Sequence, residues 1–349
     1  MPLLARTVLA PLAVEVRSDA LAHLPHLLQE TNIAPTGKVA VVVGSTGQSL
    51  VPSLELPSAT FHTVPAGSLG DARNLAARLK SVDKDAIVAI GGGRLIDTAK
   101  YAATELGVPL VVVATSLAHD GLASPVASLL NDNGASTSYG VHMPLAVLVD
   151  LTMVLQAPAV QRRSGIGDAL TNLSAVADWQ LSHRVTGERF DGLSASIAHT
   201  GAEAVLRHPG TIDDEAFLST LAAALIQGGT AMAMAGSSRP CSGGCHEIAH
   251  AVDSLFPGHG SHGEQGALGA LYCTWVRGDT GLWRDLAAAY RRHGLPTVPQ
   301  DLDLTVDQFT NAVAHAPATR PGRYTILEHR ELDTAEIRHH LDGMINELG

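Results

Sequence analysis

Three histidines between Ser238 and Gln265 have a spacing that suits the binding of a divalent metal ion. His246 and His250 are four residues apart, and His262 follows after a Pro-Gly turn. Residues four apart share one face of a helix. Neutral imidazole is a common ligand of divalent transition metals, and two imidazoles with one carboxylate leave a coordination position open for a substrate oxygen. The stretch therefore predicts a catalytic metal site, provided that another segment supplies a carboxylate.

The helix that carries these histidines is predicted to be amphipathic. Its polar stripe consists of His246, His250 and Asp253. Its apolar side consists of Ile248, Val252, Leu255 and Phe256. Two simpler interpretations compete with a catalytic site. The chain has 17 His, so a pair spaced by four also fits an ordinary helix surface. Cys241 and Cys245 suggest a structural zinc site, but the C-x3-C spacing is unusual for zinc and the chain has 3 Cys in all.

The composition limits the classes of protein and partner. A length of 349 residues with 46% hydrophobic content is enough for two packed domains. The formal net charge of -11 argues against nucleic acid or an acidic membrane as a partner, because no basic face offsets phosphate repulsion. An anionic small substrate remains compatible if a few arginines converge. Three cysteines without a disulfide pattern fit a reducing cytoplasm.

The N-terminal segment does not resemble a cleaved signal peptide. Its short apolar run is interrupted by Pro11 and Glu15. We expect no apolar stretch to approach the ~20 residues that span a bilayer. We therefore expect a soluble, cytoplasmic protein without membrane insertion.

The elements that must position a site alternate between strands and helices in the first part of the chain. Short β-branched runs predict strands at 39–43, 60–64, 86–90, 109–113 and 145–150. Helical spacing predicts helices at 71–79 and 95–104. Strands that are apolar on both faces, such as VAVVV, are typical of buried parallel sheets. The pattern predicts a doubly wound α/β domain.

Three glycines interrupt this domain between a strand and a helix. In AIVAIGGGRLIDTAK, Gly91, Gly92 and Gly93 allow a ligand to approach the backbone, and the next helix N-terminus favours a phosphate. The motif matches neither G-x-G-x-x-G nor a P-loop, so a tight strand-to-helix connection is the alternative. A turn at 44–47 is a weaker second contact of the same kind.

Polar residues also follow the next predicted strand. Thr115 and Ser116 stand at its carboxyl end, where open α/β sheets bind ligands. Asp120 precedes a glycine and could hydrogen-bond a ribose or substrate hydroxyl. Ordinary turn chemistry is the alternative interpretation.

From residue 159 onward, the chain is rich in Ala and Leu with helical periodicity, which predicts a second, helical domain. There, Asp168 lies off the apolar face, in what reads as a first helical turn. It either complements the helix dipole or provides the missing carboxylate. Arg320 and Arg323 either hold an anionic group or are solvated loop residues, the commoner case.

Several segments together resemble the sn-glycerol-1-phosphate dehydrogenase family, which belongs to a wider group of iron-type alcohol dehydrogenases, glycerol dehydrogenases and 3-dehydroquinate synthases. In order between about residues 38 and 328, the segments are GGGRLIDTAK, TSLAHDGLASP, GIGDALTNLSAVADW, SSRPCSG with its following His, HGEQ and RYTIL. The set is specific for the wider group. The DG-x-ASP and SSRP-x-SG segments favour the glycerol-phosphate branch.

The resemblance implies a fold and a set of site residues. The fold would be a Rossmann-like α/β domain with a parallel sheet over 1–155 and an all-α domain over 156–349, as in dehydroquinate synthase, with the active site between them. The metal ligands would be Asp168, His246 and His262, with Zn²⁺ as the usual ion and Fe²⁺ or Ni²⁺ as alternatives. The residues implied at NAD or NADP are Gly91, Gly92, Gly93, Arg94, Leu95, Thr115, Ser116 and Ser124. Asp120, Asp168 and His250 would face the substrate.

Two residues depart from the family pattern. Cys245 stands where the family commonly has Glu before the first ligand histidine, and Ala118 stands where the cofactor loop commonly has Ser. The first change leaves the ligands intact but alters a neighbour of the metal. The second removes a hydroxyl near the cofactor.

The residues and the resemblance together predict reduction of dihydroxyacetone phosphate to sn-glycerol 1-phosphate by NADH or NADPH. The metal would hold the carbonyl oxygen, and His250 would relay a proton or hold a hydroxyl. The resemblance also implies a homo-oligomer. The alternatives are a dehydrogenase of another polyol or specialised metabolite, a dehydroquinate synthase-like cyclase and a non-enzymatic sensor. The cyclase is disfavoured because no basic cluster is evident among the 23 Lys and Arg.

Overall fold

The computed structural model describes residues 9–45, 47, 49 and 54–348. Two compact units are present, one comprising Met1–Ala157 with Met232–Gly236 and the other Pro158–Ala231 with Ser237–Gly349. Thr46, in the glycine-containing turn at 44–47, lies outside the described residues.

The first unit is built on a six-stranded sheet in which all paired strands are parallel. The strand order is β1-β8-β5-β4-β2-β3. The strands are β1 (Ala13–Arg17), β2 (Val39–Val43), β3 (Thr60–Thr63), β4 (Ala86–Gly91), β5 (Leu110–Ala114) and β8 (Ala146–Asp150). β2, β5 and β8 are buried along their whole length because helices cover the sheet on both sides. The predicted α/β domain with a parallel sheet is confirmed.

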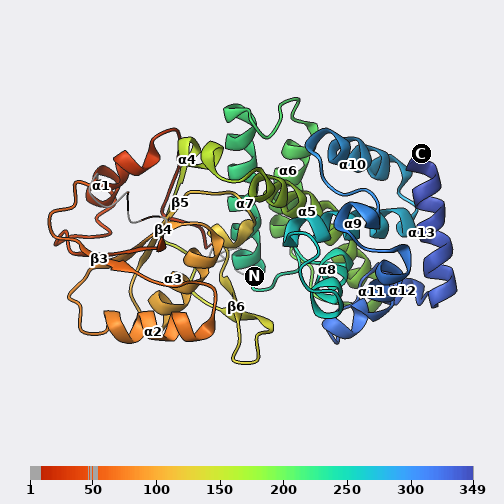
Figure 1. The fold of residues 1–349 in the computed structure, drawn as a ribbon, viewed down its shortest axis with the longest axis horizontal. Helices are drawn as coiled ribbons and strands as arrows, with labels where there is room; N and C mark the ends of the chain where they lie inside the picture. The colour runs from red at the N-terminus through yellow and green to blue at the C-terminus, as the bar shows by residue number, and fades with distance from the viewer. Residues whose placement is uncertain (1–8, 46, 48, 50–53, 349) are drawn as a thin grey trace, which may run out of the picture. The chain divides into compact units, whose positions relative to one another are not determined.

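Helices lie on opposite sides of this sheet, as Figure 1 shows for α1 (Ala20–Glu30) and α2 (Leu69–Leu79). α1 packs on β1 and β8, whereas α3 (Gly93–Leu106) packs on β4 and β5. Leu24 and Leu28 of α1 share one apolar core with alternate residues of the central strands, including Val88 and Val113. This core fixes the positions at which the strands end and the site loops begin.

Three strands of the first unit were missed by sequence reasoning. β1 is an edge strand in which Glu15 interrupts the apolar run, so it does not read as a buried strand. β6 (Val126–Leu130) and β7 (Ser136–Gly140) form an antiparallel hairpin in which more and less exposed positions alternate. A short 3-10 helix, η2 (Asp120–Leu122), leads into this hairpin, and α4 (Leu151–Gln156) follows β8.

In the second unit, every described element of secondary structure is helical, as predicted. The elements are α5 (Ala159–Thr186), α6 (Gly192–Arg207), α7 (Glu215–Ala235, whose last residues belong to the first unit), α8 (Gly244–Leu255), α9 (His262–Arg277), α10 (Thr280–His293), η3 (Pro299–Leu302), α11 (Val306–Thr319), α12 (Ile326–Arg330) and α13 (Thr334–Leu348). α5 packs along α9, and α8 packs against both α9 and α11. The site of the second unit lies where α5, α8 and α9 meet.

The expectation that no apolar stretch reaches membrane-spanning length was wrong for α7. This helix has 21 residues and is apolar enough to cross a membrane by length and composition alone. However, 67% of its most apolar window is buried inside the fold, as is usual for a core helix of a water-soluble protein. Burial against other helices accounts for its apolar character.

Candidate active site

Asp168, His246 and His262 come together from three helices of the second unit. One ligand atom from each side chain lies within 4.8 Å of the other two. Asp168 Oδ1 is 3.6 Å from His246 Nε2 and 4.0 Å from His262 Nε2. Two ligands of a tetrahedral ion at ~2.1 Å are ~3.4 Å apart, so small adjustments would bring the three atoms onto one cation. The donor set of one carboxylate and two imidazoles fits a divalent metal ion.

The cluster is closed on one side and accessible on the other. Asp168 is 5% exposed and His246 is 7% exposed, whereas the His262 side chain is 37% exposed. Burial is the largest cause that lowers the pKa of His246, so its imidazole remains neutral and keeps a lone pair for a metal. A substrate atom would therefore reach the cluster from the side of His262.

Two glycines next to the candidate ligands allow α5 and α9 to approach. A Cβ added at Gly167 would lie 2.2 Å from the carbonyl oxygen of Gly263, and one added at Gly263 would lie 1.8 Å from the carbonyl oxygen of Ser164. The Ser164 hydroxyl accepts a hydrogen bond from the Gly263 amide at 3.2 Å. Because Gly167 precedes Asp168 and Gly263 follows His262, backbone contact brings these two side chains together.

A buried carboxylate that sequence reasoning missed anchors the start of α8. Asp178, fully buried in α5, accepts hydrogen bonds from the backbone amides of Gly244 at 2.8 Å and Ile326 at 3.0 Å. Arg277 of α9 donates to the same carboxylate at 2.6 Å. Asp178 thereby links α5, α8, α9 and α12 and sets the position of His246. Its position within an Ala-rich helical segment gave no sign of this role.

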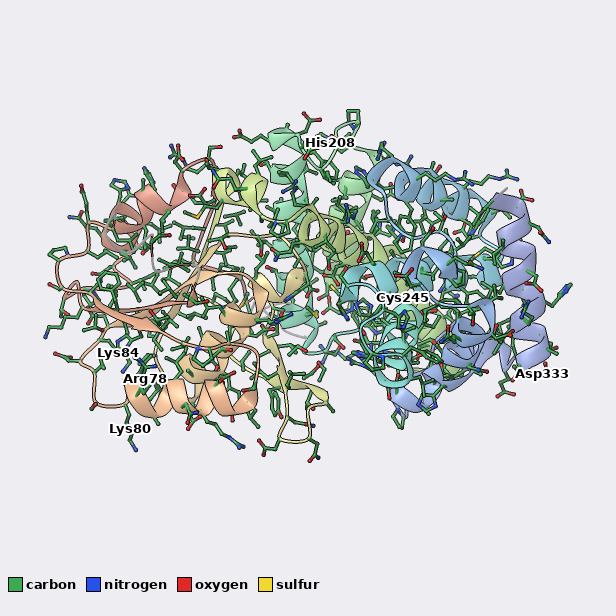
Figure 2. The ribbon with its side chains drawn as sticks, in the orientation of Figure 1. Arg78, Lys80, Lys84, His208, Cys245 and Asp333 are labelled. Atoms are coloured by element: carbon green, nitrogen blue, oxygen red, sulfur yellow. The ribbon has the colours of Figure 1, made fainter. Side chains whose placement is uncertain are left out.

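Cys245 lies beside the first candidate ligand and is buried among the helices of the second unit, where Figure 2 labels it. Its sulfur is 3.4 Å from Nδ1 of His246. Burial raises the pKa of the Cys245 thiol to about 12, so the thiol is neutral and unsuited to bind a metal as a thiolate. A partner at Nδ1 orients the imidazole while Nε2 faces Asp168, as neighbours of metal ligands commonly do.

The surroundings of His250 differ from the sequence expectation. Arg320 Nη2 lies 2.9 Å from His250 Nε2, and because a guanidinium can only donate, His250 Nε2 accepts. Burial and the charge of Arg320 lower the pKa of His250 to about 2. The imidazole therefore stays neutral, and its Nε2 is occupied by the bond from Arg320, which favours the predicted role of holding a hydroxyl over the predicted proton relay. Its ring centroid is 6.0 Å from that of His262, so it remains next to the cluster.

Three further expectations for this unit were wrong. Asp168 lies well inside α5, which begins at Ala159, so it does not serve the dipole of a first turn. Leu255 is 40% exposed and does not join the apolar side of α8. Arg320 and Arg323 are partly buried, and Arg323 donates to the Ser238 hydroxyl at 2.8 Å, so they are not solvated loop residues.

The glycine turn of the first unit connects β4 to α3 without spare room. A Cβ added at Gly91, Gly92 or Gly93 would lie 2.6 Å from Leu95 Cδ2, 2.9 Å from Ser116 Oγ or 2.3 Å from His119 Nε2, respectively. The N-cap residue of α3 is Gly92, which provides no side-chain cap. This crowding explains why the turn needs glycines, as expected for a tight connection between a strand and a helix. The N-terminus of α3, which has no side-chain cap, also suits the binding of a phosphate group.

The polar residues that follow β5 lie at this turn. Thr115 donates its backbone amide to the Gly91 carbonyl at 3.1 Å, which joins the ends of β4 and β5. Ser116 contacts Gly92, and His119, next to Ala118, contacts Gly93 and was missed by sequence reasoning. The structure thus brings Thr115 and Ser116 to the glycine turn.

Asp120 and Ser124 lie in the loop between β5 and the β6-β7 hairpin. The backbone carbonyl of Asp120 accepts from the amide of Ser124 at 3.2 Å, and the Ser124 hydroxyl donates to the Val126 carbonyl at 3.2 Å. In this structure Ser124 is therefore engaged within its own loop, and its contact with a cofactor stays a prediction.

A buried ion pair in α3 holds the same loop and was also missed. Lys100 is fully buried, lies 2.8 Å from Asp97 and donates to the backbone carbonyls of Gly121 and Val126. A lysine three residues after an aspartate in a largely apolar helix was the signal available in the sequence. Because Lys100 has carbonyl and carboxylate partners, its charge orders the loop that carries Asp120.

Comparisons with known proteins are consistent with both units. Residues 15–158 match the family model described as iron-containing alcohol dehydrogenase. Glycerol-1-phosphate dehydrogenase [NAD(P)+] of Methanospirillum hungatei is 33% identical over 344 residues, covering 97% of this chain and 94% of its own. The protein of the same name from Archaeoglobus fulgidus is 34% identical over 333 residues, covering 93% and 94%.

A solved structure has the same fold. The crystal structure of a probable glycerol dehydrogenase from Sinorhizobium meliloti superposes with a TM-score of 0.77 at 21% identity, covering 99% of both chains. At this identity the likeness supports the fold alone. Because the sequence relatives match nearly end to end at more than 30% identity, the chain belongs to the glycerol-1-phosphate dehydrogenase family.

Proposed function

We propose that this protein is a metal-dependent oxidoreductase that reduces dihydroxyacetone phosphate to sn-glycerol 1-phosphate with NADH or NADPH. The observation that carries the proposal is the convergence of Asp168, His246 and His262 within one helical unit of a chain from this family. The relatives are named for the same reaction, with NAD(P)+ as the cofactor.

Asp168, His246 and His262 are the proposed metal ligands, and we propose Zn²⁺ as the ion, with Fe²⁺ and Ni²⁺ as alternatives. When bound, the metal supplies a Lewis acid for the substrate carbonyl and the reduced nicotinamide supplies a hydride. The chain contributes two imidazoles and one carboxylate, which together leave one side accessible at His262. Gly167 and Gly263 maintain the helix contact that this geometry needs.

The residues at the glycine turn are the proposed binding site for the dinucleotide. Gly91, Gly92 and Gly93 permit backbone approach, and Arg94 and Leu95 supply the first turn of α3. Thr115 and Ser116 lie beside this turn, which supports their assignment, while Ser124 and Asp120 are placed by the loop that Lys100 holds. Enzyme assays with NADH and with NADPH distinguish between NAD and NADP as the cofactor.

The proposed roles in substrate binding are narrower than those expected from the sequence. Asp120 would hydrogen-bond a substrate hydroxyl from its loop. His250 keeps Nδ1 for a hydroxyl because Nε2 accepts from Arg320. We therefore assign His250 to holding and orienting, rather than to proton transfer.

A cyclase is the second candidate because one argument against it fails. The charges of Arg320 and Arg239 both act on Arg323, so three arginines lie near one another, one of which, Arg239, is paired with Glu188. The sequence relatives nevertheless favour the dehydrogenase, since those reported above carry that name. Dehydrogenases of other polyols and a non-enzymatic sensor are tested by the same assays.

The decisive experiment is a redox assay of the purified, Zn²⁺-loaded protein. We expect oxidation of NADH or NADPH with dihydroxyacetone phosphate, and a product of sn-1 configuration when it is tested with an enantioselective sn-glycerol 3-phosphate dehydrogenase. Dihydroxyacetone, glyceraldehyde and other small carbonyls serve as comparison substrates. Failure with dihydroxyacetone phosphate together with turnover of another carbonyl would refute the proposal.

We also propose the cellular location and the oligomeric state of the enzyme. All three cysteines are buried and free, which suits a cytoplasmic location. We propose a homo-oligomer without a nucleic-acid or membrane partner, and light scattering of the purified protein measures its mass. Metal analysis of protein purified without added ions identifies the metal.

A further inference from the structure

Two partly buried arginines stand at the end of α11, in the loop that leads to α12. Arg320 caps α11 and donates to His250 Nε2 at 2.9 Å. Arg323 donates to the Ser238 hydroxyl at 2.8 Å and to the Ser242 carbonyl. Both guanidiniums are thus fixed by neutral acceptors, and a guanidinium has five N–H donors, more than these contacts use.

Neither of these two positive charges forms an ion pair with a carboxylate among the described residues. Within the described part of the chain, no Asp or Glu oxygen lies within 4.0 Å of a nitrogen of Arg320 or Arg323. Two other arginines that are shielded from solvent do have a carboxylate partner. Arg239 donates to Glu188 at 2.8 Å, and Arg277 donates to Asp178 at 2.6 Å. Arg320 and Arg323 therefore differ from these paired arginines in lacking a carboxylate within ion-pair distance.

The two acidic residues near the pair, Glu247 and Glu188, contact other groups. Glu247 is fully buried in α8, and its carboxyl accepts from the Thr325 hydroxyl at 3.1 Å rather than from an arginine. Glu188, whose charge also acts on Arg323, forms an ion pair with Arg239. Burial lowers the pKa of Arg320, and burial with the charge of Arg320 lowers that of Arg323 to about 10. An anionic ligand would offset the free-energy cost of burying the two guanidinium charges.

The pair lies next to the candidate metal ligands. Arg320 contacts His250, whose ring centroid is 6.0 Å from that of His262, and the His262 and His246 ring centroids are 5.1 Å apart. One imidazole therefore separates the guanidinium from the cluster. A small substrate held at the metal through an oxygen could extend an anionic group to Arg320.

We infer that Arg320, positioned by His250, binds the phosphate of the substrate and sets the preference for phosphorylated three-carbon ketones over unphosphorylated ones, with Arg323 adding a second positive charge. The inference rests on the proposed function. Arg320 is the residue that touches the substrate, and His250 is a positioning residue that accepts one guanidinium hydrogen bond. Planar guanidinium donors suit phosphate oxygens better than an ammonium does.

The test compares two substrates in Arg320→Met. The variant loses one or two charge-assisted hydrogen bonds, so kcat/KM for dihydroxyacetone phosphate should fall about 100-fold, mainly through KM. For dihydroxyacetone, kcat/KM should remain within about three-fold. Arg330→Met, at an exposed arginine of α12, is the matched control and should leave both values unchanged. Arg320→Lys should restore part of the loss.

Two further measurements keep the outcomes distinct. Inorganic phosphate binding to the Zn²⁺-loaded protein, measured by calorimetry, should weaken about 10-fold or more in Arg320→Met. His250→Ala should raise KM for dihydroxyacetone phosphate while changing kcat little, and His250→Gln, which keeps an acceptor, should recover KM.

The inference fails if Arg320→Met retains the wild-type kcat/KM for the phosphorylated ketone and the wild-type affinity for phosphate. It also fails if both ketones lose activity equally, because the residue would then act on the fold or the metal. If wild-type protein does not turn over dihydroxyacetone phosphate, the proposed function fails, and the calorimetry still decides whether Arg320 binds phosphate.

Discussion

Replacing Gly263 with Ala tests whether a helix contact, rather than the ligands alone, creates the metal site. Gly263 follows His262 at the start of α9, and an added Cβ would lie 1.8 Å from the Ser164 carbonyl oxygen of α5. Ordinary contacts of a Cβ begin near 3.4 Å. The two backbones would have to separate by about 1.6 Å, the difference between these values, because neither atom belongs to a flexible side chain.

The size of the effect follows from two opposing contributions. Ala stabilises a helix interior by up to about 1 kcal/mol relative to Gly, whereas overpacking at a backbone contact costs about 1–3 kcal/mol and occasionally more. The cost of the backbone clash should exceed the gain in helix propensity, and we expect a net loss of about 2 kcal/mol in the free energy of unfolding. A shift above 1 Å exceeds the ~0.2 Å tolerance of metal-ligand distances, so metal affinity should fall about 10-fold or more.

The assay combines thermal unfolding of the metal-free protein with metal titration. At roughly 2–4 °C per kcal/mol, the melting temperature of Gly263→Ala should fall by about 4–8 °C. Gly343→Ala in α13 is the control, because its Cβ would meet Trp275 Cζ2 at an ordinary 3.4 Å, and it should be neutral or stabilising. An unchanged melting temperature and full metal affinity in Gly263→Ala would refute this account of the site.

Three further predictions concern charge. Asp168→Asn should lower metal affinity by about 100-fold or more in a metal titration, because a charged ligand is lost, and Asp132→Asn, at an exposed loop residue, should bind metal normally. Asp178→Asn breaks the buried pair with Arg277 and should cost about 3–5 kcal/mol in urea unfolding; a loss below about 1 kcal/mol would contradict its anchoring role. Burial lowers the pKa of His293 to about 4, so the unfolded state binds more protons between pH 6.5 and 4, and stability should fall by up to about 3 kcal/mol as the pH drops through this range. His293→Phe should remove that part of the pH dependence in urea unfolding at pH 7 and 5, and an unchanged slope would show that this histidine is not its source.

Much of the first unit could be predicted from the sequence because local patterns determine it. Strands buried on both faces are apolar throughout, so β2, β4, β5 and β8 were recognisable from composition. The hairpin β6-β7 and the edge strand β1 were not, because a half-exposed strand mixes polar and apolar residues. Helix periodicity identified the second unit, but it did not distinguish buried carboxylates such as Asp178 from exposed ones.

The sequence by itself determined the chemistry that is available: two imidazoles a short distance apart, a carboxylate of uncertain role, a glycine turn and two loop arginines. Only the tertiary structure decided which of these groups meet. Asp168 joins His246 and His262 because Gly167 and Gly263 let two helices touch, and Arg320 becomes a partly buried charge because its loop folds back onto α8. Contacts between residues far apart in the chain depend on backbone packing and burial, and neither leaves a periodic pattern near the residues involved.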